Sequence, residues 1–155
     1  DIIFSECNGK EYVITADRDE HVRISRGIPQ THIIEGYCLG HREFVSQLCS
    51  PAGQPNLLIS GGGDDDMFIW DWALGQLLQK INLRKYIEKL APSVDQASQT
   101  DHDVNRGDNW LLESVKVAVS NIRNVANASD QEDDLILVTC EGLAKKFFAI
   151  ANTIY

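Results

Sequence analysis

Residues 59–70 read ISGGGDDDMFIW, and residues 14–25 read ITADRDEHVRIS at a constant offset of 45 positions. In both stretches a short apolar run ends in Ser or Thr, a turn rich in Asp follows, and a second strand-like run comes after it, alternating in residues 21–25 and apolar throughout in residues 67–70. Two such runs around a turn are typical of paired β-strands, so each stretch predicts a β-hairpin. The constant offset indicates that the hairpin belongs to a repeated β unit.

Six residues in and around the second copy have a defined spacing. Gly40-His41 stands ahead of the copy, Ser60 and Asp64 lie within it, and Trp70-Asp71 closes it 29 residues after His41. This pattern resembles the WD repeat, in which a four-stranded unit forms one blade of a β-propeller. The indole N–H of Trp70 can only donate, and the hydroxyl of Ser60 can accept and donate. We therefore expect His41 to link Ser60 to the carboxylate of Asp64, so that His41, Ser60, Asp64 and Trp70 form a structural relay.

The predicted turns and strands place two blades before residue 84. Residues 40–83 are expected to form a complete WD blade, with strands over 44–50, 57–60, 67–72 and 76–83. Residues 1–39 are expected to form a partial blade that begins before residue 1 and lacks the Trp, because Thr15 and Ser25 take the positions of Ser60 and Trp70. Its fourth strand is expected over 31–39.

The regular spacing ends after Leu83. Residues 84–109 contain Pro92 and many polar residues, so they are interpreted as an insertion, and residues 83–90 hint at a short helix. Residues 110–155 are expected to form a degenerate partial blade without its own Gly-His or Trp-Asp pair, with strands over 114–125, 135–140 and 144–151.

The predicted fold class is therefore all-β, with about three blades of a β-propeller. Closed propellers use four to eight blades, so that no apolar blade face is left without a neighbour. The sequence begins without Met and in residues that already look like a strand. We expect the chain to be a piece of a larger ring.

Several residues resemble parts of a catalytic, metal or cofactor site, but the sequence argues against each of these assignments. His41, Ser60 and Asp64 are the residue types of a nucleophilic triad, but the GxSxG turn that often presents such a serine is absent. Asp64-Asp65-Asp66 lacks the glycine and distal glutamate of a calcium loop of the EF type. Gly61-Gly62-Gly63 lies in a hairpin and not between a strand and a helix, so it does not predict a cofactor loop.

Composition limits the possible partners further. The formal net charge is -9, which disfavours a primary contact with nucleic acid, although Arg84-Lys85 and Lys145-Lys146 could touch phosphate. The four cysteines have no CxxC spacing and are expected to be buried, reduced thiols. No apolar run approaches the 18 residues of a membrane span, so no membrane partner is expected.

The amino-acid sequence of the first hairpin points to one family more specifically than the repeat pattern does. Residues 15–25, followed by Tyr37-Cys38-Leu39-Gly40-His41 and by residues 43–46, resemble the non-catalytic WD-repeat subunit of the eukaryotic tRNA (guanine-N7) methyltransferase. The resemblance is clear over residues 1–83. It implies a seven-bladed propeller in the nucleus that binds and stabilises the catalytic subunit as a heterodimer. That subunit would methylate the guanosine at position 46 of tRNA with S-adenosylmethionine, and would supply most of the contact with tRNA.

Under this resemblance the chain itself has no catalytic, cofactor or metal site. Asp17, Arg18, Glu20 and Arg23 are the predicted partner-binding residues, because Arg suits the planar pairing with a carboxylate that protein interfaces use. Asp19 is excluded from this set, because it is expected to be the structural residue of the turn.

Two other functions remain open from the sequence. One is a WD-repeat adaptor for an unrelated assembly, such as a ubiquitin ligase or a signalling complex, which the fold permits equally. The other is a propeller enzyme, which would need inward polar groups from several blades.

Overall fold

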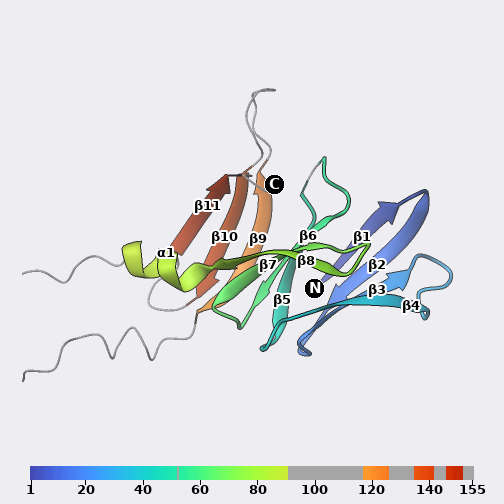
Figure 1. Cartoon of the computed structure of the whole chain (residues 1–155), viewed down its shortest axis with the longest axis horizontal. Coiled ribbons are helices and arrows are strands. Elements are labelled where there is room, and N and C mark those ends of the chain that lie inside the picture. Colours follow the sequence, from blue (N-terminus) through green and yellow to red (C-terminus); the bar gives the residue numbers. More distant parts are fainter. Residues whose placement is uncertain (52, 91–116, 126–134, 142–145, 152–155) are drawn as a thin grey trace, which may run out of the picture.

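A computed structural model gives the fold and describes residues 1–51, 53–90, 117–125, 135–141 and 146–151. The described strands form three antiparallel sheets that stand side by side along the chain (Figure 1). Each sheet pairs strands that are neighbours in the sequence, which is the topology of a propeller blade.

The first sheet has four strands, in sequence order. They are β1 (Ile2–Cys7), β2 (Lys10–Ala16), β3 (His21–Arg26) and β4 (Ile34–Leu39). The prediction of a partial blade over residues 1–39 is wrong in this respect, because residues 2–7 already supply the first strand. Gly9, with a φ of 72°, forms the tight turn between β1 and β2.

The second sheet has the four strands predicted for the complete blade, with ends shifted by a few residues. They are β5 (Val45–Cys49), β6 (Leu57–Gly62), β7 (Asp66–Asp71) and β8 (Gln76–Asn82). The helix α1 (Leu83–Leu90) follows at once, where the sequence hinted at one. The side chain of Asn82 caps it by accepting a hydrogen bond from the N–H of Lys85, at 3.0 Å.

The third sheet contains three described strands, in the order β11-β10-β9. These are β9 (Ala118–Val125), β10 (Leu135–Glu141) and β11 (Lys146–Ala151), close to the predicted ranges. The predicted boundary between insertion and third blade, at residues 109 and 110, lies outside the described residues. None of the described residues forms a helix long and apolar enough to cross a membrane.

The pairing of residues between strands repeats with the same offset of 45 residues as the sequence. Val13 pairs with Ser25 as Leu58 pairs with Trp70, and Thr15 pairs with Arg23 as Ser60 pairs with Phe68. Because side chains alternate across a strand, matched positions face the same way in the two blades. The two hairpins can therefore be compared residue by residue.

The core lies between the sheets. Ile14, Val22 and Ile24 of the first blade pack in one buried cluster with Leu58, Phe68 and Trp70 of the second. On the opposite face of the second blade, Ile59, Met67 and Ile69 pack with Val119, Ile122 and Val138 of the third. Burial of each such side chain contributes about 1.5–3 kcal/mol. This face-to-face packing identifies the sheets as blades of a β-propeller.

The first strands of neighbouring blades are also tied by hydrogen bonds. The Ser46 hydroxyl in β5 donates to the carbonyl of Val119 in β9, at 2.8 Å. Asp1, at the position that matches Ser46, accepts a hydrogen bond from the N–H of Leu48 in β5 through its carboxylate, at 2.9 Å. The inner strands β1, β5 and β9 are therefore joined directly to one another.

Candidate functional site

The four predicted relay residues form one chain of hydrogen bonds. The indole Nε1 of Trp70 donates to the Ser60 hydroxyl at 2.8 Å, and that hydroxyl lies 2.7 Å from Nε2 of His41. Nδ1 of His41 lies 2.7 Å from a carboxylate oxygen of Asp64. All four side chains are buried. The relay thus spans strands β6 and β7 and the two loops that lead into β5 and β7.

The donors and acceptors set the direction of the relay. The indole N–H of Trp70 donates to the Ser60 oxygen, and burial favours the neutral ring of His41, so the Ser60 hydroxyl donates to Nε2 of His41. His41 is then a neutral ring that donates from Nδ1 to Asp64. Burial lowers the pKa of His41, and the hydrogen bond and charge of Asp64 oppose that shift.

The protonation of His41 makes stability depend on pH. The unfolded histidine takes up a proton near pH 6.5, whereas the folded ring resists it, so the His41 contribution is complete above that pH and decreases as the pH falls below it. We expect the free energy of unfolding to fall more between pH 7.5 and 5.5 in the wild-type protein than in His41→Asn. Urea denaturation at both pH values measures this difference. An equal fall in both proteins would rule out the neutral ring.

Asp64 also holds the loop that enters the second blade. Its carboxylate accepts hydrogen bonds from the backbone N–H of Arg42, at 3.2 Å, and of Glu43, at 3.4 Å. The ring of His41 packs against Phe68, with centroids 4.0 Å apart. Ser60 is fully buried, so a substrate cannot reach its hydroxyl. The arrangement stabilises the blade and does not present a nucleophile.

The two aspartates after Asp64 have partners of their own. Asp65 accepts two hydrogen bonds from the guanidinium of Arg84 in α1, at 2.9 and 3.0 Å. Asp66 pairs with Lys80 at 2.8 Å and accepts from Asn82 at 2.7 Å. The three carboxylates therefore point to separate partners. Within the described ranges, no cluster of three or more His, Cys, Asp or Glu side chains could hold a metal ion.

The predicted partner-binding residues lie at one end of the first blade. Asp17, Arg18 and Glu20 are exposed in the β2–β3 loop, and Arg23 is half-buried in β3. The loop is tied to the second blade, because the carbonyl of Asp17 accepts from the N–H of Val45 at 3.2 Å. The structure thus brings the four residues to neighbouring positions on one hairpin.

Asp17, and not Asp19, has the structural role in the turn between β2 and β3. The side chain of Asp17 accepts a hydrogen bond from the N–H of Asp19, at 2.9 Å, and so shapes the turn. Asp19 is exposed. Its assignment as the structural residue of the turn is therefore wrong, although its alignment with Asp64 is correct.

Arg23 has an unusual environment. It lies between Thr15 and Tyr37 on adjacent strands, and the matched position in the second blade is Phe68. Its Nε is buried and has no hydrogen-bond partner within the described part of the chain. A buried donor without a partner costs about 1–3 kcal/mol. The matched side chain of Phe68 is buried against the neighbouring blade, so Arg23 lies on the face that a preceding blade would cover.

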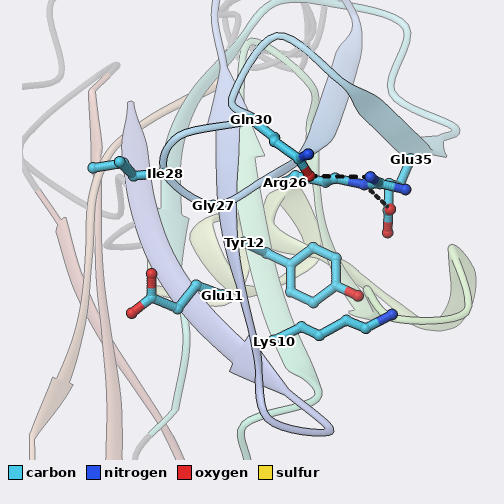
Figure 2. A pocket seen from close by; sticks show the side chains of 8 residues that line it. All are labelled: Lys10, Glu11, Tyr12, Arg26, Gly27, Ile28, Gln30 and Glu35. Atoms are coloured by element: carbon cyan, nitrogen blue, oxygen red, sulfur yellow. Dashed lines mark hydrogen bonds and ion pairs between the residues drawn. The ribbon is translucent and has the colours of Figure 1, made fainter.

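A cavity of about 360 Å³ lies at the opposite end of the same blade. Figure 2 shows the ring of Tyr12 below an ion pair between Arg26 and Glu35, and Arg26 also donates to Gln30 at 3.1 Å. The hydrogen bond from Arg26 lowers the pKa of the Glu35 carboxyl. Arg26 and Glu35 of the cavity thus neutralise each other. The sequence did not indicate it, because β2, β4 and the β3–β4 loop meet there only in the folded sheet.

The cysteines are free thiols. Cys38, Cys49 and Cys140 are buried, as predicted, and Cys7 is half-buried. Burial raises the pKa of Cys38 to about 12 and that of Cys140 to about 11. Thiols of this kind remain protonated and pack as small apolar side chains.

A comparison with known proteins identifies one family of WD-repeat domains over nearly the whole chain. A family model described as "tRNA methyltransferase TRM82 WD40 domain" matches residues 1–153. The match includes the insertion and the third blade, where the sequence alone showed only a weak resemblance.

Named relatives agree with the family match. The chain is 44% identical over 147 residues to the tRNA (guanine-N(7)-)-methyltransferase non-catalytic subunit trm82 of Sclerotinia sclerotiorum, covering 95% of this chain and 26% of the relative. It is 45% identical over 148 residues to the subunit of the same name from Phaeosphaeria nodorum, covering 95% and 28%. The chain therefore spans about a quarter of the length of these relatives. On the family match and these identities, the chain belongs to the TRM82 WD40-domain family.

Proposed function

We propose that the complete protein is the non-catalytic subunit of a tRNA (guanine-N7) methyltransferase, and that it binds and stabilises the catalytic subunit. The observation that carries the proposal is the match to the TRM82 WD40 domain over residues 1–153, together with the names of the relatives. The site supports the same role, because the residues that could suggest a hydrolase are buried in a structural relay.

The chemistry of the reaction is proposed to reside in the partner. The catalytic subunit would bind S-adenosylmethionine and form 7-methylguanosine at position 46 of tRNA. It would also make most of the contact with the tRNA, since this chain has a formal net charge of -9. We further propose that the ring has seven blades, that the two subunits form a heterodimer, and that the complex works in the nucleus.

A pull-down of the complete protein tests the proposed function. The eluate is expected to contain the catalytic subunit and to form 7-methylguanosine in tRNA when S-adenosylmethionine is added. An eluate that contains a ubiquitin ligase or a signalling assembly, without methylation of tRNA, would favour the adaptor function.

The proposed binding site for the catalytic subunit is the β2–β3 loop with Arg23. Asp17, Arg18 and Glu20 are exposed there, and Arg23 is half-buried on the adjoining strand. A carboxylate on the partner would pair with the guanidinium of Arg23. Arginine donates to both oxygens of a carboxylate in a fixed geometry, so this pair would also orient the two subunits.

Reversing the charge at Arg23 tests the site. Arg23→Glu is expected to weaken binding of the catalytic subunit by about 30-fold or more, because truncation of one member of a desolvated charge pair costs about 2 kcal/mol or more. Arg26→Glu is the matched control, since it makes the same change on the same strand at the opposite end. Binding is measured by titration calorimetry and folding by thermal unfolding.

Two results would contradict the assignment of Arg23. Wild-type affinity in Arg23→Glu would remove it from the interface. A large drop in melting temperature in Arg23→Glu, but not in Arg26→Glu, would instead assign Arg23 to the stability of the blade.

A further inference from the structure

The β2–β3 loop of the first blade and the β6–β7 turn of the second are held in different ways. Asp19 lies at the position that matches Asp64, but the side chain of Asp19 is exposed, whereas that of Asp64 is buried. Ser25 stands where the second blade has Trp70, so it has no indole N–H to donate. A relay like that of the second blade is therefore not available to this loop from Asp19 and Ser25.

A hydrogen bond from the second blade holds the β2–β3 loop at its first residue. The backbone N–H of Val45 donates to the carbonyl of Asp17 at 3.2 Å, across the boundary between the blades. Val45 is only 1% exposed, so water does not compete for this bond. The carboxylate of Asp17 accepts the N–H of Asp19 at 2.9 Å. Val45 thus fixes the residue that shapes the turn of the loop.

The three residues before Val45 are in turn bonded to the β6–β7 turn. The carboxylate of Asp64 accepts hydrogen bonds from the backbone N–H groups of residues 42–43, at 3.2–3.4 Å. The carbonyl of Phe44 accepts the N–H of Gly63 at 2.9 Å. The position of the Val45 N–H is therefore set by the turn that carries Asp64.

The relay orients the carboxylate of Asp64. Nδ1 of His41 lies 2.7 Å from one of its oxygens, and Nε2 of His41 lies 2.7 Å from the Ser60 hydroxyl, which accepts from Trp70 at 2.8 Å. Each hydrogen bond in a buried network strengthens and orients its neighbours. A connected path of bonds thus runs from Trp70 in the core of the second blade to Asp17 in the exposed loop of the first.

We propose that His41 and Asp64 are positioning residues for binding of the catalytic subunit, because they hold the β2–β3 loop of the neighbouring blade in the conformation that the subunit binds. The proposal rests on the function proposed above. His41 is 5% exposed and Asp64 is 9% exposed, so both act through Val45 and Asp17 and not by contact. A loop that is already ordered loses less conformational freedom on binding, so loosening it lowers the affinity.

Two substitutions at Asp64 in the complete protein test the positioning role. Asp64→Ala is expected to weaken binding of the purified catalytic subunit about tenfold, measured at a temperature at which the variant is folded. Asp64→Asn keeps an oxygen that can accept the N–H groups of residues 42–43, so it is expected to bind more tightly than Asp64→Ala. Titration calorimetry measures the affinity, and circular dichroism measures the folded fraction.

Ile136→Ala is the control for a general loss of stability. Ile136 is buried in β10, in the cluster between the second and third blades, and so has no part in the path to the β2–β3 loop. Truncation of a buried isoleucine destabilises a protein at least as much as loss of a buried acceptor. Ile136→Ala is therefore expected to unfold at a lower temperature and to bind like the wild type. A tenfold loss of affinity in both variants would assign the effect to stability alone.

Hydrogen exchange of the protein without its partner gives a second readout. The amide of Val45 is expected to exchange faster in Asp64→Ala than in Ile136→Ala, because only the first variant releases the segment that carries this amide. Equal exchange in the two variants would show that Asp64 does not position the loop.

The outcomes separate this inference from the proposed function. If the wild type does not bind the catalytic subunit, the proposed function fails and the positioning role in binding fails with it. If the wild type binds and folded Asp64→Ala binds within about twofold of it, the positioning role alone is refuted. Should Asp64→Ala not fold, His41→Asn replaces it, because it removes the ring that orients the Asp64 carboxylate. Wild-type affinity in folded His41→Asn would then overturn the proposal, and weaker binding with faster exchange at Val45 would support it.

Discussion

Replacement of Asp64 by Ala is expected to lower the free energy of unfolding by about 3 kcal/mol, because three donors lose their acceptor at once. They are Nδ1 of His41 and the backbone N–H groups of Arg42 and Glu43. His41 is buried, so water cannot replace the carboxylate without opening the blade. Urea denaturation of the complete protein measures the loss.

The adjacent aspartate is the control for this substitution. Asp65 is partly exposed and pairs with Arg84 at the surface, and exposed ion pairs contribute only about 0–1 kcal/mol. Asp65→Ala removes the same side chain one position away and is expected to cost less than about 1 kcal/mol. Equal losses of unfolding free energy in the two variants would show that the hydrogen bonds of the relay do not account for the stabilising effect of Asp64.

Replacement of Gly62 by Ala is expected to destabilise the protein by about 3 kcal/mol or more. A Cβ at this position would lie 1.9 Å from the carbonyl oxygen of Phe44 and 2.8 Å from its carbonyl carbon. Both are backbone atoms, and the same oxygen accepts the N–H of Gly63 at 2.9 Å. The clash cannot be relieved by rotating a side chain, so the start of β5 must move away from β6.

Gly36 provides the control for the second substitution. It lies in β4, where a Cβ would meet only Cδ1 of Ile24, at 3.8 Å. Gly36→Ala is expected to change stability by less than about 1 kcal/mol, and it can stabilise the protein because Ala restricts the unfolded chain. Denaturation curves of both variants test the contrast. A Gly62→Ala protein as stable as Gly36→Ala would mean that β5 does not approach β6 as closely as described.

The relay could be predicted from the sequence because its members are chemically complementary. Trp, Ser, His and Asp at that spacing offer donors and acceptors in only one workable order, and the structure contains that order. The hairpins could be predicted because two strand-like runs around an Asp-rich turn recur at a constant offset, and the register of pairing repeats with the same offset.

Features without local chemical marks were harder to predict. Residues 2–7 form β1 and already look like a strand, but the sequence placed the start of their blade before residue 1, so the first blade was expected to be partial. Asp19 aligns with Asp64, but Asp19 is exposed, whereas Asp64 is buried and bonded to His41. The turn then uses Asp17, whose side chain is two residues from the N–H it accepts. The alignment predicts where Asp19 lies in the turn, but the role of a residue depends on the groups that it contacts.

The hydrogen bonds of Ser46 and Asp1 join the blades along their first strands, whereas β4 and β8 are last strands and take no part in these bonds. The inner margin of the sheets therefore carries this part of the cohesion between blades. Natural selection, or a protein engineer, could rewrite the outer margin for a new partner while the inner margin keeps the blades joined.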